Sequence, residues 1–385
     1  MPGKKRPASP GSPPSDGDDS SISDGGWTVS DSGSDEEECD EEEYRGAYRP
    51  FTVDDFPRLG SGFLEQTGTL YEIPDIHLRG PRPLSLFRAY KDHVIIENGN
   101  HVFADTYQLS DESEVSVGSI TNVDCSNQCH CFPATLVQFI DLKIAGYRHT
   151  QPGHAKIFGF FAARDYIKPL RNYIYRHNVD NCEAVSVKQK TGMARLSLTS
   201  PARGICMTSH VLFEFELFIR TSEDEAKGDI LIAGCTEFTE FHRSESFVET
   251  RRLYGEKCGL DVKFAVLSNA VQAMIDVEIL HASIGGLNLK LFAKTSGFSD
   301  VIRLFRGVVE AGYKMSSVVA VEVHSYLGIC IEGSSTDNDD LDVVKWESRF
   351  DASYHGTVAE VVKLDDLVTI SVKISWEAVH DRRQC

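Results

Sequence analysis

Short stretches in which every second residue is apolar recur along most of this chain. In the stretch His210–Arg220, five apolar side chains fall on one side of an extended strand: Val211, Phe213, Phe215, Leu217 and Ile219. Residues 271–279 and 367–376 alternate in the same way. A period of two with one polar side is typical of an antiparallel strand that is buried on one face. We therefore expect three such strands here.

Similar runs, separated by turns rich in Gly, Asn, Asp and Ser, bring the total to roughly a dozen strands. They lie at 136–144, 157–163, 194–198, 230–238, 262–266, 287–292, 318–326, 343–350 and 358–363. A stripe with helical spacing is rare, which favours an all-β fold, an antiparallel β-sandwich, over a parallel fold with crossover helices. The exceptions are residues 301–311, which read as a helix, and residues 141–147, which read as a turn.

The region before the strands divides into two parts. Residues 1–45 contain thirteen acidic and four basic residues and few large apolar ones, so we expect a disordered acidic tail. Residues 46–130 carry scattered prolines and an Asn98-Gly99 turn signal, typical of a semi-ordered extension with a possible hairpin at 92–106. Residues 131–380 form the expected β-sandwich domain.

Six serines of the tail are candidate phosphorylation sites. Four precede an acidic residue by three positions and two precede proline: Ser15, Ser21, Ser32 and Ser34, then Ser9 and Ser12. Each phosphate adds roughly −1.5 to −2 charges. An acidic, serine-rich tail also matches such patterns by composition alone, and both interpretations stay open.

The charge of the chain narrows the classes of partner. With 39 Lys and Arg against 58 Asp and Glu, the net charge is −19, and general nucleic-acid binding is disfavoured because it depends on Lys and Arg contacts to phosphates. No window of 18 apolar residues predicts a membrane span, and the N-terminus lacks the apolar stretch of a secretory signal. We expect a cytoplasmic or nuclear protein, or one found in both, with reduced cysteines and protein partners of unknown identity.

Several motifs within 136–380 resemble a plant family whose function is unknown. They are Phe-Gly-Phe-Phe-Ala-Ala-Arg-Asp at 158–165, Arg-Asn-Tyr-Ile-Tyr at 171–175 with Asp-Asn-Cys at 180–182, Leu-Ser-Leu-Thr-Ser-Pro-Ala-Arg-Gly at 196–204, Val-Leu-Phe-Glu-Phe-Glu-Leu at 211–217, Ala-Val-Gln-Ala-Met-Ile-Asp-Val at 270–277 and Ile-Ser-Val-Lys-Ile-Ser-Trp at 370–376. The family is expanded in cereal grasses and occurs alone or beside ribosome-inactivating-protein domains. The resemblance implies a β-rich plant domain and leaves its activity open.

The polar residues most closely woven into these motifs form one candidate cluster: Arg164, Asp165, Asn172, Asp180 and Asn181. One interpretation places them together at one end of the sandwich as a polar ligand pocket. The other, which we favour, is structural: Arg164 is held by a carboxylate such as Asp165 or Asp180, and the Asn and Asp side chains bond to backbone groups at turns.

Two further groups contain metal-ligand side chains. Cys125, Cys129, His130 and Cys131 lie close in sequence, but no second pair of zinc ligands stands nearby, so a reduced loop is favoured over a zinc site. Four aspartates at 337–342 lack the spacing of an EF-hand, so a solvated acidic hairpin is favoured over a calcium site. We expect no metal and no cofactor.

No motif in the sequence specifies an enzymatic reaction. Nucleophile-elbow, zinc-protease, phosphate-loop and dinucleotide-binding patterns are all missing, so no catalytic residue is assigned. The favoured hypothesis is a non-enzymatic interaction or ligand-binding module. The alternatives are a ribosome-inactivating N-glycosidase relative, which would need a Glu-Ala-x-Arg helix, and a calcium-dependent lipid-binding sandwich.

Overall fold

The computed structural model describes eleven stretches of the chain: 52–57, 80–84, 106–116, 132–148, 154–207, 210–220, 228–240, 244–282, 286–335, 343–365 and 368–378. All belong to one compact unit, Gly46–Cys385. The acidic tail with its six serines, the Cys125–Cys131 group and the aspartates at 337–342 lie outside the described residues. The predictions made for those segments therefore stay predictions.

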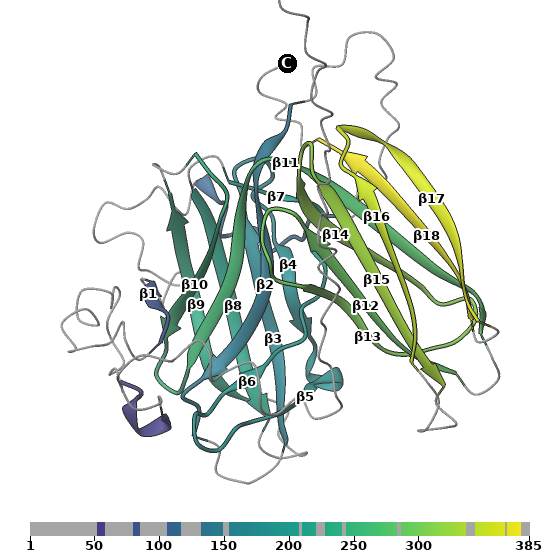
Figure 1. Cartoon of the computed structure of the whole chain (residues 1–385). Coiled ribbons are helices and arrows are strands. Elements are labelled where there is room, and N and C mark those ends of the chain that lie inside the picture. Colours follow the sequence, from purple (N-terminus) through teal and green to yellow (C-terminus); the bar gives the residue numbers. More distant parts are fainter. Residues whose placement is uncertain are drawn as a thin grey trace, which may run out of the picture. The chain divides into compact units, whose positions relative to one another are not determined.

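Strands account for 66% of the described residues and helices for 3% (Figure 1), which confirms the all-β prediction. Two three-residue 3₁₀ helices accompany them, η1 (Val53–Asp55) and η4 (Val179–Asn181). The eighteen strands are β1 (Arg82–Leu84), β2 (Ala134–Ala145), β3 (His154–Arg164), β4 (Asn172–His177), β5 (Glu183–Ser186), β6 (Ala194–Arg195), β7 (Ile205–Cys206), β8 (His210–Arg220), β9 (Asp229–Thr239), β10 (Phe247–Tyr254), β11 (Gly259–Ala282), β12 (Leu287–Thr295), β13 (Ile302–Val309), β14 (Lys314–Glu322), β15 (Tyr326–Ser335), β16 (Val344–Asp351), β17 (His355–Leu364) and β18 (Val368–Glu377).

These strands form three sheets, one of which is built on a single long strand. The five-stranded sheet has the order β4-β3-β8-β9, with β5 also paired to β3, and the four-stranded sheet has the order β13-β12-β15-β16. In the third sheet, the 24-residue β11 pairs with β10 and β2 along its first half and with β14 and β18 along its second half. The two halves meet at Asn269, which adopts a positive φ of 53°.

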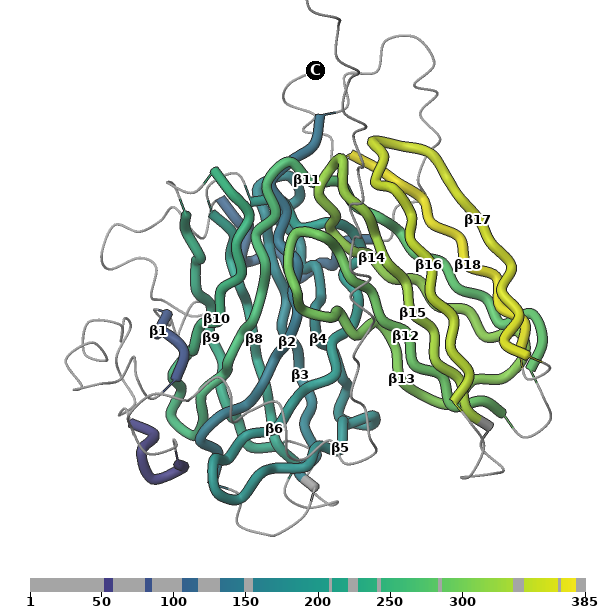
Figure 2. The backbone as a smooth tube through the Cα atoms, in the orientation of Figure 1, coloured from purple at the N-terminus to yellow at the C-terminus, as the bar shows by residue number. Residues whose placement is uncertain are grey.

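Each half of β11 therefore forms a wall of its own sandwich. The first sandwich packs the five-stranded sheet against β2, β10 and the first half of β11, around a core rich in aromatic rings, among them Phe139, Phe161, Phe213 and Phe264. The second packs the four-stranded sheet against β14, β17, β18 and the second half of β11. Figure 2 shows the strands of the four-stranded sheet side by side. The prediction of one sandwich with roughly a dozen strands therefore gave too few strands and one sandwich instead of two.

The expected helix at 301–311 is wrong, because this segment is the strand β13. Leu291 lies opposite Phe305 and Phe292 opposite Arg303, so Leu304 is an extra residue in a bulge. The bulge shifts the apolar side chains out of strict alternation and spaces Ile302, Phe305 and Val309 as in a helix. Pairing with β12 decides the structure.

The expected turn at 141–147 is also wrong over most of its length. Strand β2 continues to Ala145, and the chain turns only at Gly146, whose φ is +66°. A second bulge lies just before this segment, where Ile140 is the extra residue opposite Lys263 and Phe264. It directs Ile140 into the second core, whereas Phe139 and Leu142 pack in the first.

The extension before the sandwiches contributes a few described segments. Phe56, just after η1, is buried and stacks on Tyr254 with ring centroids 5.2 Å apart. Strand β1 adds in parallel to β10, and residues 106–116 lie on the five-stranded sheet, where Tyr107 is fully buried against Leu212 and Cys235. Apart from Thr106, the hairpin predicted at 92–106 lies outside the described residues.

The alternation of β8 leads to a stability prediction. Phe215 is fully buried in the first core, and its neighbour Glu216 points to the opposite face. We expect Phe215→Ala to lower the free energy of unfolding by about 3–5 kcal/mol and Glu216→Ala by less than about 1 kcal/mol, measured by chemical denaturation. Equal losses would show that the register of β8 is wrong.

Candidate functional site

The outer face of the five-stranded sheet, on the side away from the first core, carries the most unusual side chains of the described residues. Even-numbered residues of β3 and β8 point to this face and pair across the two strands in five rows. The rows are Arg164 with Leu212, Ala162 with Glu214, Phe160 with Glu216, Phe158 with Phe218 and Lys156 with Arg220. The face therefore changes from polar and buried at one end to aromatic and cationic at the other.

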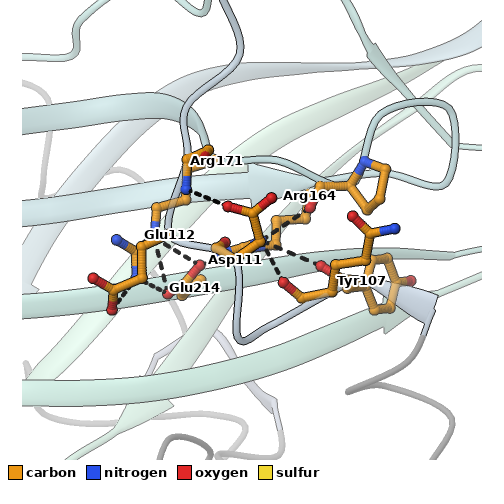
Figure 3. A network of polar contacts seen from close by, with 9 residues as sticks. Tyr107, Asp111, Glu112, Arg164, Arg171 and Glu214 are labelled. Atoms are coloured by element: carbon orange, nitrogen blue, oxygen red, sulfur yellow. Dashed lines mark hydrogen bonds and ion pairs between the residues drawn. The ribbon is translucent and has the colours of Figure 1, made fainter.

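Arg164 is the centre of the polar end (Figure 3). Its side chain is fully buried, and its Nε donates to Glu214 Oε2 at 2.7 Å. Its two terminal nitrogens donate to four backbone carbonyls, those of Tyr107, Gln108, Asp111 and Pro169, at 2.8–3.2 Å. Every nitrogen of the guanidinium is thus engaged, and three of its bonds tie segment 106–116 to the sheet.

Glu214 also binds a second guanidinium, that of Arg171. Arg171 donates through Nη2 to Glu214 Oε1 at 2.6 Å and lies 3.3 Å from Glu112 Oε1. Burial works to raise the pKa of Glu214, but the hydrogen bonds and positive charges of Arg171 and Arg164 outweigh it and hold this pKa below its usual range. A fully buried carboxylate therefore stays ionised between two arginines.

We call the buried ion network of Arg164, Glu214 and Arg171 the anchor. Segment 106–116 covers the anchor and adds hydrogen bonds of its own. The Tyr107 hydroxyl donates to Glu237 Oε1 at 2.9 Å, and burial, reinforced by Glu237, raises the pKa of Tyr107. Val115 N donates to Arg171 O, and Arg171 N donates to Ser113 O. The backbone around Arg171 is thus paired with the covering segment as well.

At the other end of the face, four half-buried rings lie next to one another. Phe158 and Phe218 are stacked, with centroids 5.0 Å apart and planes 12° apart. Phe160 meets Tyr173 edge to face at 5.8 Å. We call these four residues the aromatic face. Ile230, which pairs with Phe218, is half exposed beside it.

Two arginines hold the aromatic face in place. The Arg171 guanidinium lies over the ring of Phe160, 4.6 Å from its centroid, and Arg176 lies over Tyr173 at 4.4 Å and pairs with Glu114. Such contacts are worth about 0.5–1 kcal/mol at exposed sites. Arg171 therefore touches both the buried anchor and the aromatic face and connects the two.

Gly159, between Phe158 and Phe160, allows the backbone of β3 to approach β8 closely. Its φ is +114°, and a Cβ there would lie 2.0 Å from the backbone oxygen of Glu216. A side chain at this position would push β3 and β8 apart. The close approach therefore requires glycine at the position between Phe158 and Phe160.

Three of the five sequence candidates lie in buried polar contacts, but not in one pocket. Asp165 points to the opposite face from Arg164. Its carboxylate accepts hydrogen bonds from the two terminal nitrogens of Arg203, at 2.5 and 2.8 Å, and from the backbone nitrogen of Cys206. Asn172 donates to Arg203 O and accepts from Ala202 N. These bonds fix the loop that leads into β7.

Asp180 and Asn181 lie elsewhere, exposed in η4. Among the described residues, no hydrogen bond or ion pair joins their side chains to the other three candidates. A carboxylate does hold Arg164, but it is Glu214 and neither of the two named as examples, Asp165 and Asp180, because alternation turns the adjacent Asp165 to the opposite face. No observation bears on ligand binding by these five residues.

Sequence reasoning missed Glu214, Arg171 and Arg203 as members of these networks. A signal for Glu214 was present, since it stands in a run of apolar residues in which both faces of the strand are largely buried. A carboxylate in such a position needs a buried cation. Nothing in the sequence identified which arginines supply it.

The other described parts of the structure give little support for a metal, membrane or ligand site. Within the described stretches, no three His, Cys, Asp or Glu side chains are grouped to hold a metal ion, and none of the helices has the length and apolarity to cross a membrane. A cavity of about 30 Å³ lies between β2, the 198–205 segment and β13. It has room for one or two water molecules rather than an organic ligand.

A family model described as a domain of unknown function, DUF6598, matches residues 136–374. The chain belongs to this family. The match begins within β2 and ends within β18, so it includes both sandwiches and the aromatic face. No curated protein matches the sequence.

Some solved structures are distantly similar. A human GIVD cytosolic phospholipase A2 is 12% identical, with a TM-score of 0.20 over 64% of this chain and 33% of that chain. The calcium-bound tandem C2 domains of extended synaptotagmin 2 are 11% identical, with a TM-score of 0.23 over 66% of this chain and 99% of that chain. The chain thus spans about a third of the phospholipase. Similarities this weak carry no argument about fold or function.

The anchor gives a prediction with a pH dependence. Because the pKa of Glu214 is lowered by folding, its contribution to stability is present above the ordinary carboxyl pKa of roughly 4.3 and is lost as the pH falls through the lower, folded-state value. We expect Glu214→Gln to cost about 3–5 kcal/mol at neutral pH, since Arg164 loses its buried counter-charge and Arg171 keeps only the exposed Glu112. The difference from wild type should shrink on acidification.

Urea denaturation of both proteins between pH ~7 and pH ~3 measures this difference. Glu216→Gln, two residues along the same strand and half-buried, is the matched control and should change stability little. A Glu214→Gln cost that is the same at every pH would contradict an ionised Glu214.

Proposed function

We propose that this protein is a non-enzymatic binding module inside the cell and that its aromatic face is the binding surface. The observation that carries the proposal is the gathering of Phe158, Phe160, Tyr173 and Phe218 on one half-exposed sheet face, with arginines packed on two of the rings. Aromatic residues and arginine are the types enriched at the energetic centres of interfaces.

The rigidity of this face supports the same proposal. It stands on a central strand pair, and Arg171 fixes Phe160 from a buried ion network. A contact surface that is already ordered loses little conformational entropy on binding. The face is thus prepared for a partner, whereas a purely structural cluster would be expected to lie under a covering element.

The resemblance to a family found beside ribosome-inactivating domains suggests an enzyme as the second candidate. Of the two Glu-Ala strings that approach the required Glu-Ala-x-Arg helix, the one at 183–186 forms the strand β5, and the one at 225–228 lies largely outside the described residues. Both strings lack the arginine. We therefore favour binding over purine excision.

Calcium-dependent lipid binding is the third candidate. Its proposed ligands, the aspartates at 337–342, lie outside the described residues. No contact, burial or charge of a described residue favours it.

Affinity capture tests the proposed binding surface. The full chain, Phe158→Ala and Val361→Ala would be immobilised and exposed to extract of the source tissue, and bound proteins and nucleic acids identified. Val361 is the matched control, because it is an apolar residue, 64% exposed, on β17 of the second sandwich. We expect specific components that Val361→Ala retains and Phe158→Ala loses. Identical recovery by all three would contradict a role of the aromatic face.

A further inference from the structure

We infer that the ligand of the aromatic face is a single-stranded nucleic acid, whose unpaired bases stack on the rings while phosphates lie at the neighbouring cations. This inference rests on the proposed function and names its ligand class. The charge of −19 argues against attraction between nucleic acid and the protein as a whole. Single-stranded nucleic-acid sites combine stacking rings with a local positively charged groove, so the inference depends on the cations beside the rings and not on the net charge.

The sequence of β3 supplies the first argument. A pattern known from RNA-binding sheets is Lys/Arg, Gly, Phe/Tyr, Gly/Ala, Phe, Val, any residue, then Phe/Tyr, with its aromatic residues on the exposed face. Residues 156–163 read Lys-Ile-Phe-Gly-Phe-Phe-Ala-Ala and match it at the basic position, at Gly159 and at both inner aromatic positions. The second, sixth and eighth positions differ, so the agreement concerns the exposed face and not the fold.

The register of the sheet supplies the second argument. Phe158 lies directly opposite Phe218, and the next row of the same face places Lys156 directly opposite Arg220. Rings and cations therefore occupy adjacent rows, about 6.8 Å apart along the strands. This is the combination of stacking platform and phosphate contact that single-stranded nucleic-acid sites use.

Stacking geometry supplies the third argument. Phe158 and Phe218 are nearly parallel, at 12°, so a flat base can extend their stack as a third ring. Phe160 is braced by Arg171, and Tyr173 by Arg176. Since every base has a π face, we expect binding that tolerates many sequences and discriminates against duplexes, in which the bases are already stacked.

Fluorescence anisotropy with labelled ten-nucleotide probes tests the inference on the full chain. The probes are one RNA, the DNA of the same sequence and the corresponding DNA duplex, at about 50 mM salt. We expect a dissociation constant of about 1–100 µM for the single strands and weaker binding of the duplex. If the dissociation constants for the RNA and the DNA strand differ, the tighter one identifies the nucleic acid that the site prefers. Equal constants indicate recognition by base stacking alone.

Variants separate this site from other surfaces. Phe158→Ala and Phe218→Ala should each weaken binding by about 5- to 150-fold. Phe158→Tyr, which keeps an aromatic ring, and Val361→Ala, which lies elsewhere, should bind as the wild type does. Lys156→Gln should reduce the slope of log affinity against log salt from about −1.4 to about −0.7, a readout that a loss of packing does not move. Denaturation curves confirm that each variant is folded.

Absence of binding by both single strands, or equal binding by wild type and both alanine variants, would overturn the inference. If the aromatic face nevertheless captures a protein in the tissue experiment and Phe158→Ala loses it, the proposed function holds and only the ligand class is wrong. If neither experiment depends on Phe158, both proposals fail.

Discussion

Glu214 is one carboxylate that compensates two buried guanidinium groups, and the outer face of the five-stranded sheet depends on it. Without it, Arg164 would be a buried cation with no carboxylate partner and Arg171 would keep only the exposed Glu112, and an uncompensated buried charge is strongly destabilising. With it, Arg164 is free to donate to the backbone of segment 106–116, and Arg171 is held over Phe160. The same ion network thus fixes a covering segment on one side and an exposed ring on the other.

A buried ion network of this kind is a weak source of net stability, because desolvation of the charges offsets most of their attraction. Its effect is better described as specification of geometry. Bonds from Arg164 to four carbonyls, three of them in the covering segment, determine where that segment lies on the sheet. The stability of the fold comes instead from the two apolar cores that β11 connects.

Alternation along the strands was enough to predict the all-β class and the buried side of β8, since solvent exposure imposes it on any half-buried strand. It failed at β13, where a single bulged residue shifts the period and mimics a helix, and at residues 141–147, most of which continue β2. The candidate site shows a similar limit. Arg164 was recognised from its motif, but its partner Glu214 is 50 residues away, and only the pairing of β3 with β8 brings the two together.

Hydrogen–deuterium exchange of wild type and Glu214→Gln tests the central role of Glu214 most directly, because it reports on the covering segment itself. The account predicts faster exchange of the amides in 106–116, including Val115, which donates to Arg171 O, with unchanged exchange in β17 and β18 of the second sandwich. Unchanged protection of 106–116 in the variant, with the protein still folded, would contradict the claim that this carboxylate holds the face together.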